Sequence, residues 1–69
     1  MRIDRTGGVL PALLVRPEDA AQALGVGRTK VYELMRSGAL RSVKIGGLRR
    51  IPADALAEFV AQLEAEEAA

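Results

Sequence analysis

The sequence predicts a small α+β domain, mostly α, with two short helices, a β-hairpin and a C-terminal helix. Three observations indicate this fold class. Apolar residues recur at helical spacing on both sides of Gly25, and two short runs with β-branched residues flank Gly46-Gly47. A longer amphipathic pattern then runs from Leu56 to Leu63. With 69 residues, we expect one domain that buries roughly 60% of its unfolded surface, and no second domain.

The first predicted helix begins at Pro17, because the N–H that proline lacks is one that a helix start leaves unpaired anyway. Two acidic residues follow in the first turn, where the helix dipole favours negative charge. Ala20 and Ala21 give this helix a face of small side chains that a second helix can approach closely. Gly25 is a typical residue to end it.

The second predicted helix follows after a short turn and ends at Gly38. Val31, Leu34 and Met35 share one face and are expected in the core. The outer face then carries Arg28, Thr29, Lys30, Tyr32, Glu33 and Arg36. Two helices joined in this way, with a basic polar outer face on the second, are typical of a DNA-reading helix-turn-helix. Such helix pairs also occur as plain packing units in all-α proteins.

Charge is distributed unevenly along the chain, although the net charge is only +1. Residues 1–27 are neutral in sum, whereas residues 28–50 hold seven basic residues against Glu33 alone. Residues 51–69 hold five acidic residues and no basic one. A basic middle segment of this kind favours a polyanion as partner, and we expect double-stranded DNA.

A β-hairpin, here called the wing, is predicted around Gly46-Gly47, and two registers are open. A two-residue turn would pair Ile45 with Leu48 and Val43 with Arg50. A three-residue loop would instead pair Ile45 with Arg49 and Val43 with Ile51.

We favour the three-residue loop, because it turns Val43, Ile45 and Ile51 to the core together. Lys44 and Arg50 would then share the outer face of the wing. In either register, six residues of the wing are candidates for contact with DNA: Lys44, Gly46, Gly47, Leu48, Arg49 and Arg50.

The last predicted helix opens at Pro52 and carries its apolar stripe on Leu56, Phe59, Val60 and Leu63. This stripe is expected to close the core over the wing and the second helix. We expect a domain over residues 13–64, with Leu13 to Val15 packed under the helix pair. Residues 1–12 are predicted to form a flexible arm, and residues 65–69 an acidic tail that frays.

Composition excludes several classes of function. The chain has no Cys and no His, so nucleophile–base pairs built on them are ruled out and a zinc site is improbable. We therefore expect no enzyme, no cofactor, no metal and no small-molecule ligand. The longest apolar run, from Val9 to Val15, is far below the ~20 residues of a membrane span. We expect a cytoplasmic protein that does not enter the membrane.

From Leu14 to Leu63 the sequence resembles the excisionase-type winged helix-turn-helix proteins, relatives of the DNA-binding domain of MerR regulators. The matching residues are PEDAA from Pro17, LGV from Leu24, RTKVYELM from Arg28, GAL from Gly38, and VKIGGLRRIP leading into Asp54–Phe59. The resemblance implies that the second helix enters the major groove while the wing lies along an adjacent minor groove or the backbone. It also implies a recombination directionality factor of a phage or mobile element, which bends DNA, binds cooperatively and recruits an integrase.

Two residues depart from the pattern of this family. Gly27 stands where Ser is frequent, so the second helix lacks a side-chain cap, at a cost of only a few tenths of a kcal/mol. Glu33 stands where a basic residue is common. Its carboxylate either accepts a hydrogen bond from a cytosine amine or weakens binding by repelling phosphate.

The sequence is compatible with three functions. An excisionase is favoured, because only a few acidic residues follow Leu63, whereas regulators of this kind usually append a dimerisation helix or a ligand domain. A small MerR-like transcriptional regulator with the same fold is the alternative. A protein-interaction module is less favoured, since it leaves the basic wing unexplained. For the excisionase we expect head-to-tail self-association on DNA, with the basic wing of one copy against the acidic last helix of the next.

Overall fold

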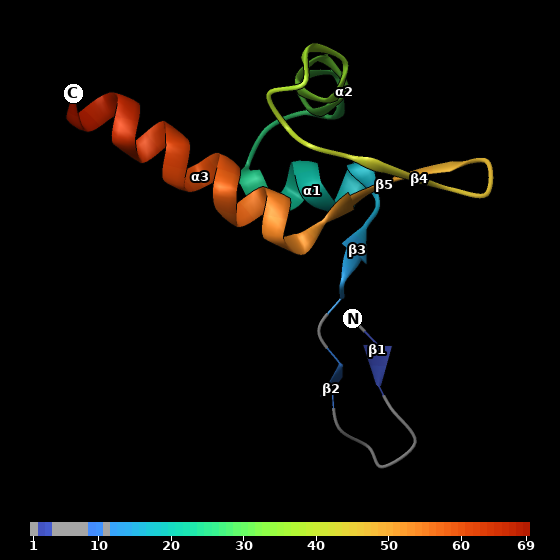
Figure 1. Cartoon of the computed structure of the whole chain (residues 1–69). Helices are drawn as coiled ribbons and strands as arrows, with labels where there is room; N and C mark the ends of the chain where they lie inside the picture. Colours follow the sequence, from blue (N-terminus) through green and yellow to red (C-terminus); the bar gives the residue numbers. More distant parts are fainter. Residues whose placement is uncertain (1, 4–8, 11) are drawn as a thin grey trace.

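Three helices, a three-stranded antiparallel sheet and a two-stranded N-terminal pair make up the described part of the chain, which is residues 2–3, 9–10 and 12–69 of the computed structural model (Figure 1). The elements in chain order are β1 (Arg2–Ile3), β2 (Val9–Leu10), β3 (Leu14–Val15), α1 (Pro17–Leu24), α2 (Arg28–Ser37), β4 (Val43–Ile45), β5 (Leu48–Pro52) and α3 (Ala53–Ala68). This arrangement confirms the predicted winged helix-turn-helix fold.

The core is small and lies where α1, α2, β5 and the start of α3 meet. Its buried members are Ala20, Ala21, Val31, Leu40, Ile51 and Ala55. The two alanines allow α2 to pack closely on α1, as their small side chains predict. α1 ends where Gly25 takes a left-handed conformation, with φ of 73°, and its N–H bonds back to the carbonyl oxygens of Ala21 and Gln22.

β5 is the central strand of a three-stranded sheet in the order β3-β5-β4. β3 pairs antiparallel with β5, placing Val15 opposite Ile51. The carbonyl oxygen of Leu13 also accepts a hydrogen bond of 2.9 Å from the N–H of Ala53. The segment expected to pack under the helices is therefore an edge strand, in which Val15 is half-buried while Leu13 and Leu14 remain exposed.

The register of the wing differs from the one we favoured. Val43 pairs with Arg50, Lys44 with Arg49 and Ile45 with Leu48, so the turn has two residues and the three-residue loop is wrong. Gly46 has φ of 60° and Gly47 has no positive φ, the combination that a type II′ turn requires. This turn matches the twist of the flanking strands, and that decides the register.

The corrected register also changes which side chains share a face. Lys44 lies with Arg49 rather than with Arg50, and Arg50 lies with Val43 on the other face. Of the three residues expected in the core, Ile51 is buried, Val43 is half-buried and Ile45 is 55% exposed. The expectation failed because Ile51 is covered through β3 and the helices, while the outer part of the wing projects beyond the core (Figure 1).

α3 begins at Ala53, one residue later than expected, because Pro52 ends β5 and stands at the N-cap position. The helix continues to Ala68, and so includes most of the tail over residues 65–69 that was expected to fray. Ala55 is buried, and Leu56 and Phe59 pack against the core. The rest of the predicted stripe does not close the core: Val60 and Leu63 are 40% and 44% exposed, since this half of α3 runs past the body (Figure 1).

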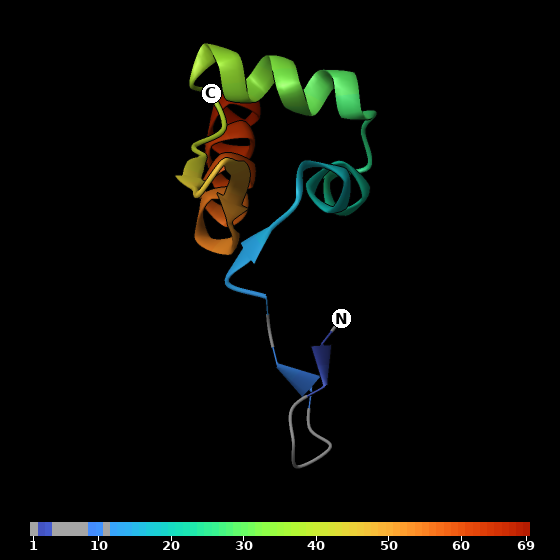
Figure 2. The same cartoon turned by 90° about the vertical axis from the view of Figure 1, so that its right-hand side faces the viewer.

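At the N-terminus, β1 pairs antiparallel with β2, with Arg2 opposite Leu10 and Ile3 opposite Val9. Figures 1 and 2 show this pair at the end of the molecule away from α2. The predicted arm over residues 1–12 falls largely on positions 1, 4–8 and 11, which lie outside the described residues.

Candidate nucleic-acid interface

The outward face of α2 carries the six predicted polar residues, and all six are exposed: Arg28, Thr29, Lys30, Tyr32, Glu33 and Arg36. Val31 on the opposite side is fully buried, and Leu34 and Met35 pack against the core. Burial of these apolar side chains fixes the rotation of the helix about its axis. The residues predicted to contact DNA are thus held outward by a face that cannot turn without exposing the core.

Lys30 and Glu33 interact with each other on this face. The Lys30 Nζ lies 3.8 Å from a carboxylate oxygen of Glu33, one helical turn along, and both side chains are more than half exposed. An exposed pair at this distance contributes little to stability and is easily separated. The pair places one donor and one acceptor side by side, and both remain free to reach a ligand.

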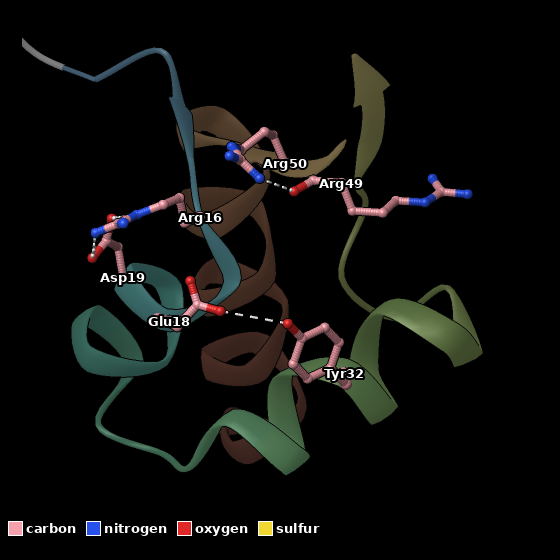
Figure 3. Close-up of polar contacts among 6 residues, drawn as sticks. All are labelled: Arg16, Glu18, Asp19, Tyr32, Arg49 and Arg50. Carbon is pink, nitrogen blue, oxygen red and sulfur yellow. Dashed lines mark hydrogen bonds and ion pairs between the residues drawn. The ribbon is translucent and has the colours of Figure 1, made fainter. Parts of the chain in front are cut away.

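Tyr32 connects α2 to the first turn of α1. Its hydroxyl donates a hydrogen bond of 3.5 Å to a carboxylate oxygen of Glu18, and the two side chains point toward each other across the helix pair (Figure 3). Glu18 is thereby drawn to the outward side of the two helices. The ring of Tyr32 stays 42% exposed, which leaves an aromatic surface beside the cations of α2.

In the wing, the cations are divided between the two faces of the hairpin. Lys44 and Arg49 are directly opposite each other and share the face that, farther along β5, carries the buried Ile51. Arg50 leaves the other face, and its Nη1 donates a hydrogen bond of 2.8 Å to the carbonyl oxygen of Arg49. Figure 3 shows the two guanidinium groups pointing in opposite directions from β5. The sequence predicted the cations but not this division.

A hydrogen-bonded charged pair lies at the start of α1. Arg16 Nε donates a hydrogen bond of 3.1 Å to the Asp19 carboxylate, and this bond holds the pKa of Asp19 below its usual range. The positive charge of Arg50 adds a smaller lowering of the same pKa. Arg50 thus acts only weakly on Asp19, and its own hydrogen bond goes to the backbone of Arg49.

The tip of the wing consists of Gly46 and Gly47, with Ile45 and Leu48 paired directly behind them. Both of these apolar side chains are 55% exposed. They lie on the face that also carries Val43 and Arg50, opposite Lys44 and Arg49.

Arg41 has a structural contact that the sequence did not indicate. Its Nη2 lies 3.3 Å from both carboxylate oxygens of Glu58, which ties the segment after α2 to α3. The two residues are 17 positions apart and share no motif, so only the fold brings them together. Arg41 thus differs from the other cations of the basic middle segment.

Comparison with known proteins identifies the family. Residues 14–64 match the family described as "Helix-turn-helix domain", which is most of the chain. An "Excisionase" from Streptomyces ambofaciens is 52% identical over 52 residues, covering 75% of this chain and 82% of its own length. The chain belongs to the excisionase-type helix-turn-helix family of DNA-binding proteins.

Two further relatives are similar to most of this chain. A protein named "Probable excisionase" from Saccharopolyspora erythraea is 49% identical over 57 residues, covering 83% of this chain. The match spans 58% of that relative, so the chain covers just over half of its length. "Magnetosome protein MamR" from Magnetospirillum gryphiswaldense is 33% identical over 60 residues, covering 84% of this chain and 71% of its own. No solved structure matches the chain significantly.

Within residues 2–3, 9–10 and 12–69, no group of three or more acidic residues is placed to hold a metal ion. No helix in the same part of the chain is long and apolar enough to cross a membrane. The candidate interface with DNA is the exposed face of α2 together with the wing.

Proposed function

We propose that this chain is an excisionase that binds attachment-site DNA through α2 and the wing, bends it, and directs an integrase toward excision. It would act in the cytoplasm and catalyse no step itself. The observation that carries the proposal is the exposed basic surface on α2 and the wing. Over the aligned residues, the chain is also about half identical to two relatives named as excisionases.

Charge supports DNA as the ligand. Five cations stand exposed on α2 and the outer wing: Arg28, Lys30, Arg36, Lys44 and Arg49. Glu33 is the only acid between Arg28 and Arg50, and it lies beside Lys30. Phosphates would therefore meet cations over both elements, and each contact would release a counterion.

The two elements would have different tasks. In a helix-turn-helix, residues near the start of the second helix reach base edges, which gives Thr29, Lys30 and Glu33 the reading role. Arg28 and Arg36 lie at the two ends of α2, where a helix crossing the groove meets the phosphates. Lys44 and Arg49 would hold the wing to the backbone beside the groove.

A single copy has one reading helix, and single modules bury at most about 1,000 Å² of protein surface on DNA. Excision would thus require several copies side by side. The basic wing of one copy and the acidic α3 of the next suit a head-to-tail contact, which does not close on itself and extends along DNA. Glu58 is already held by Arg41, so the contact would fall on the exposed Glu64 and its neighbours.

An apolar groove supports contact with a partner protein such as an integrase. It has a volume of about 580 Å³ and lies between the helix-turn-helix and the projecting half of α3. Its lining includes Leu24, Val26, Leu34, Phe59 and Leu63. The groove is separate from the wing, so a partner bound there would leave the cations of the wing free, although Lys30 of α2 is among its lining residues.

A small transcriptional regulator is the second candidate, because a relative similar to most of this chain is named as a magnetosome protein rather than an excisionase. A regulator would act at a promoter and would need no recombinase. The two functions share DNA binding and differ in what the bound protein does next.

Reconstituted recombination would test the proposal. A supercoiled plasmid carrying the two attachment sites of an integrated element is incubated with its integrase, with and without this protein. We expect excised circles only when both proteins are present. The Arg28→Ala/Arg49→Ala double variant, whose side chains are exposed, should fold normally and yield no circles. DNA binding by the wild type without any excision would favour the regulator.

Gel-shift titration on DNA with one, two and three sites tests the assembly. Cooperative filling of tandem sites by a protein that is monomeric alone is the expected result. Independent filling, or a stable two-fold dimer without DNA, would rule out the head-to-tail contact.

A further inference from the structure

Gly47 has no reason within the folded chain to be a glycine. Gly46 needs its positive φ for the turn, but Gly47 has no positive φ. A Cβ placed on Gly47 would meet nothing within 4 Å. An alanine there would reduce the freedom of the unfolded chain and so favour folding. What a glycine does offer at the tip of a hairpin is close approach of the backbone to another molecule.

Directly behind this bare tip, Ile45 and Leu48 form an exposed apolar pair. They are cross-strand partners, and each is 55% exposed, although the chain has a core that buries other aliphatic residues completely. The II′ turn forces them outward, because it fixes the register that puts Ile45 on the face opposite Ile51. The wing thus has one face with Lys44 and Arg49, and an opposite face on which Ile45 and Leu48 form an apolar patch next to the tip, with Arg50 farther along β5.

The same hairpin indicates which partner this apolar face contacts. No acidic residue occurs between Glu33 and Asp54, so the whole wing and its approaches are basic. Neighbouring strands lie about 4.8 Å apart, and the minor groove of B-DNA is about 6 Å wide. Because about 4.8 Å separates only the strand axes and the backbone atoms add to that width, a two-stranded tip without side chains enters this groove by widening it. The walls of the groove are apolar sugar carbons edged by phosphates.

We propose that Ile45 and Leu48 act as an apolar wedge that opens the minor groove and bends the DNA when the wing, with Gly46-Gly47 leading, lies in that groove. Lys44 and Arg49 bind the phosphates of one strand, while the wedge packs against the sugars and base steps. Apolar side chains inserted in this way unstack base steps and kink DNA toward the major groove. The inference rests on the proposed function and assigns its bending step to two residues.

The test separates bending from binding on a DNA that carries a single site. Bending is measured by fluorescence transfer between the DNA ends, and affinity by titration at several salt concentrations. We expect the wild type to bend this DNA by about 20° or more per bound copy. Ile45→Ser and Leu48→Ser should lose most of the bend and keep the salt dependence, because both variants retain every cation that binds phosphate.

Three further variants serve as controls for the bending experiment. Leu13→Ser replaces another exposed aliphatic residue outside the wing and should bend DNA as the wild type does. Arg49→Ala should lower the magnitude of the log–log salt slope by about 0.9 and keep the bend. Gly47→Ala should fold with an unchanged or higher melting temperature and still bind more weakly, because its methyl group obstructs the tip. Circular dichroism confirms that each variant is folded.

Three results would overturn the wedge. A bend that stays intact in Ile45→Ser and Leu48→Ser would place bending elsewhere. If these variants bend a single site normally and fail only in cooperative filling of tandem sites, the tip is a contact between copies. Binding by Gly47→Ala as tight as that of the wild type would show that the tip does not approach DNA. If the wild type shows no salt-dependent binding at all, the proposed function itself fails, a result distinct from all three.

Discussion

Lys44 and Arg49 lie directly opposite each other on β4 and β5, and both side chains leave the same face of the wing. Arg50, the next residue along, leaves the opposite face and donates a hydrogen bond to the carbonyl oxygen of Arg49. Two adjacent arginines of the same sequence run therefore have different surroundings. This division of charge gives the first prediction.

Lys44→Ala and Arg49→Ala should each reduce the magnitude of the log–log salt slope of DNA binding by about 0.9, since each removes one cation that binds a phosphate. Arg50→Ala should change the slope less, because the side chain leaves the other face and donates a hydrogen bond to the carbonyl oxygen of Arg49. Titrations between low and physiological salt measure all three slopes. Equal effects of Arg49→Ala and Arg50→Ala would contradict the assignment of faces.

The wild-type slope itself is the second prediction. With about four to six phosphates bound by cations, the log–log slope should be roughly −4 to −5. Arg41→Ala is the matched control: it removes a cation of the same basic segment, but one that is held by Glu58 3.3 Å away. The slope should stay unchanged in this variant. A wild-type slope near zero would contradict DNA as the ligand.

The third prediction concerns sequence reading by α2. Lys30→Ala and Glu33→Ala should alter the preferred sequence, and each base that is no longer read should weaken specific binding by roughly 1–3 kcal/mol. Because the two side chains form an ion pair 3.8 Å long, their effects should not add in the double variant. Selection from a random DNA library measures the preference. An unchanged preference in both single variants would show that α2 only positions the protein.

The fourth prediction compares two isoleucines of the wing. Ile51→Ala should lower the free energy of unfolding by about 2–5 kcal/mol, because Ile51 is completely buried. Ile45→Ala removes the same atoms from an exposed site and should change it by no more than about 0.5 kcal/mol. Urea unfolding followed by circular dichroism gives both values. Similar losses in the two variants would restore the register in which both residues face the core.

The fifth prediction concerns the Asp19 carboxylate. Arg16→Gln should raise the pKa of Asp19 toward its ordinary value, because the hydrogen bond from Arg16 is the main cause of the lowering. A carboxyl group whose pKa is lower in the folded state stabilises the fold above its unfolded pKa of about 3.9, and this contribution disappears as the pH falls through the folded pKa. Titration by NMR in both proteins measures the shift. An unchanged pKa in Arg16→Gln would assign the lowering to other charges.

Much of the fold was predictable because the decisive signals are local. Pro17, Gly25 and Gly38 mark helix ends through their own backbone preferences, and the structure ends α1 and α2 where they indicate. Val31 was assigned to the core from spacing alone, since one buried face of a helix imposes its period on the sequence. The exposed polar face of α2 follows from the same period. The roles proposed for its residues remain predictions.

The tertiary structure decided what depends on partners far apart in the chain. The alternation of apolar residues favoured a wing in which one face lies entirely in the core. In the structure the core ends at Ile51, and Ile45 lies beyond it. The turn geometry at Gly46 therefore sets the register. Val15 pairs with Ile51, and Arg41 contacts Glu58. Each contact joins two segments far apart in the sequence, so no local sequence pattern predicts it. The sequence by itself determined the helices, their ends and the basic segment, because those follow from each residue's own chemistry. Only the fold decided which face each cation of the wing occupies, because a shift of one residue in register moves every side chain to the other side.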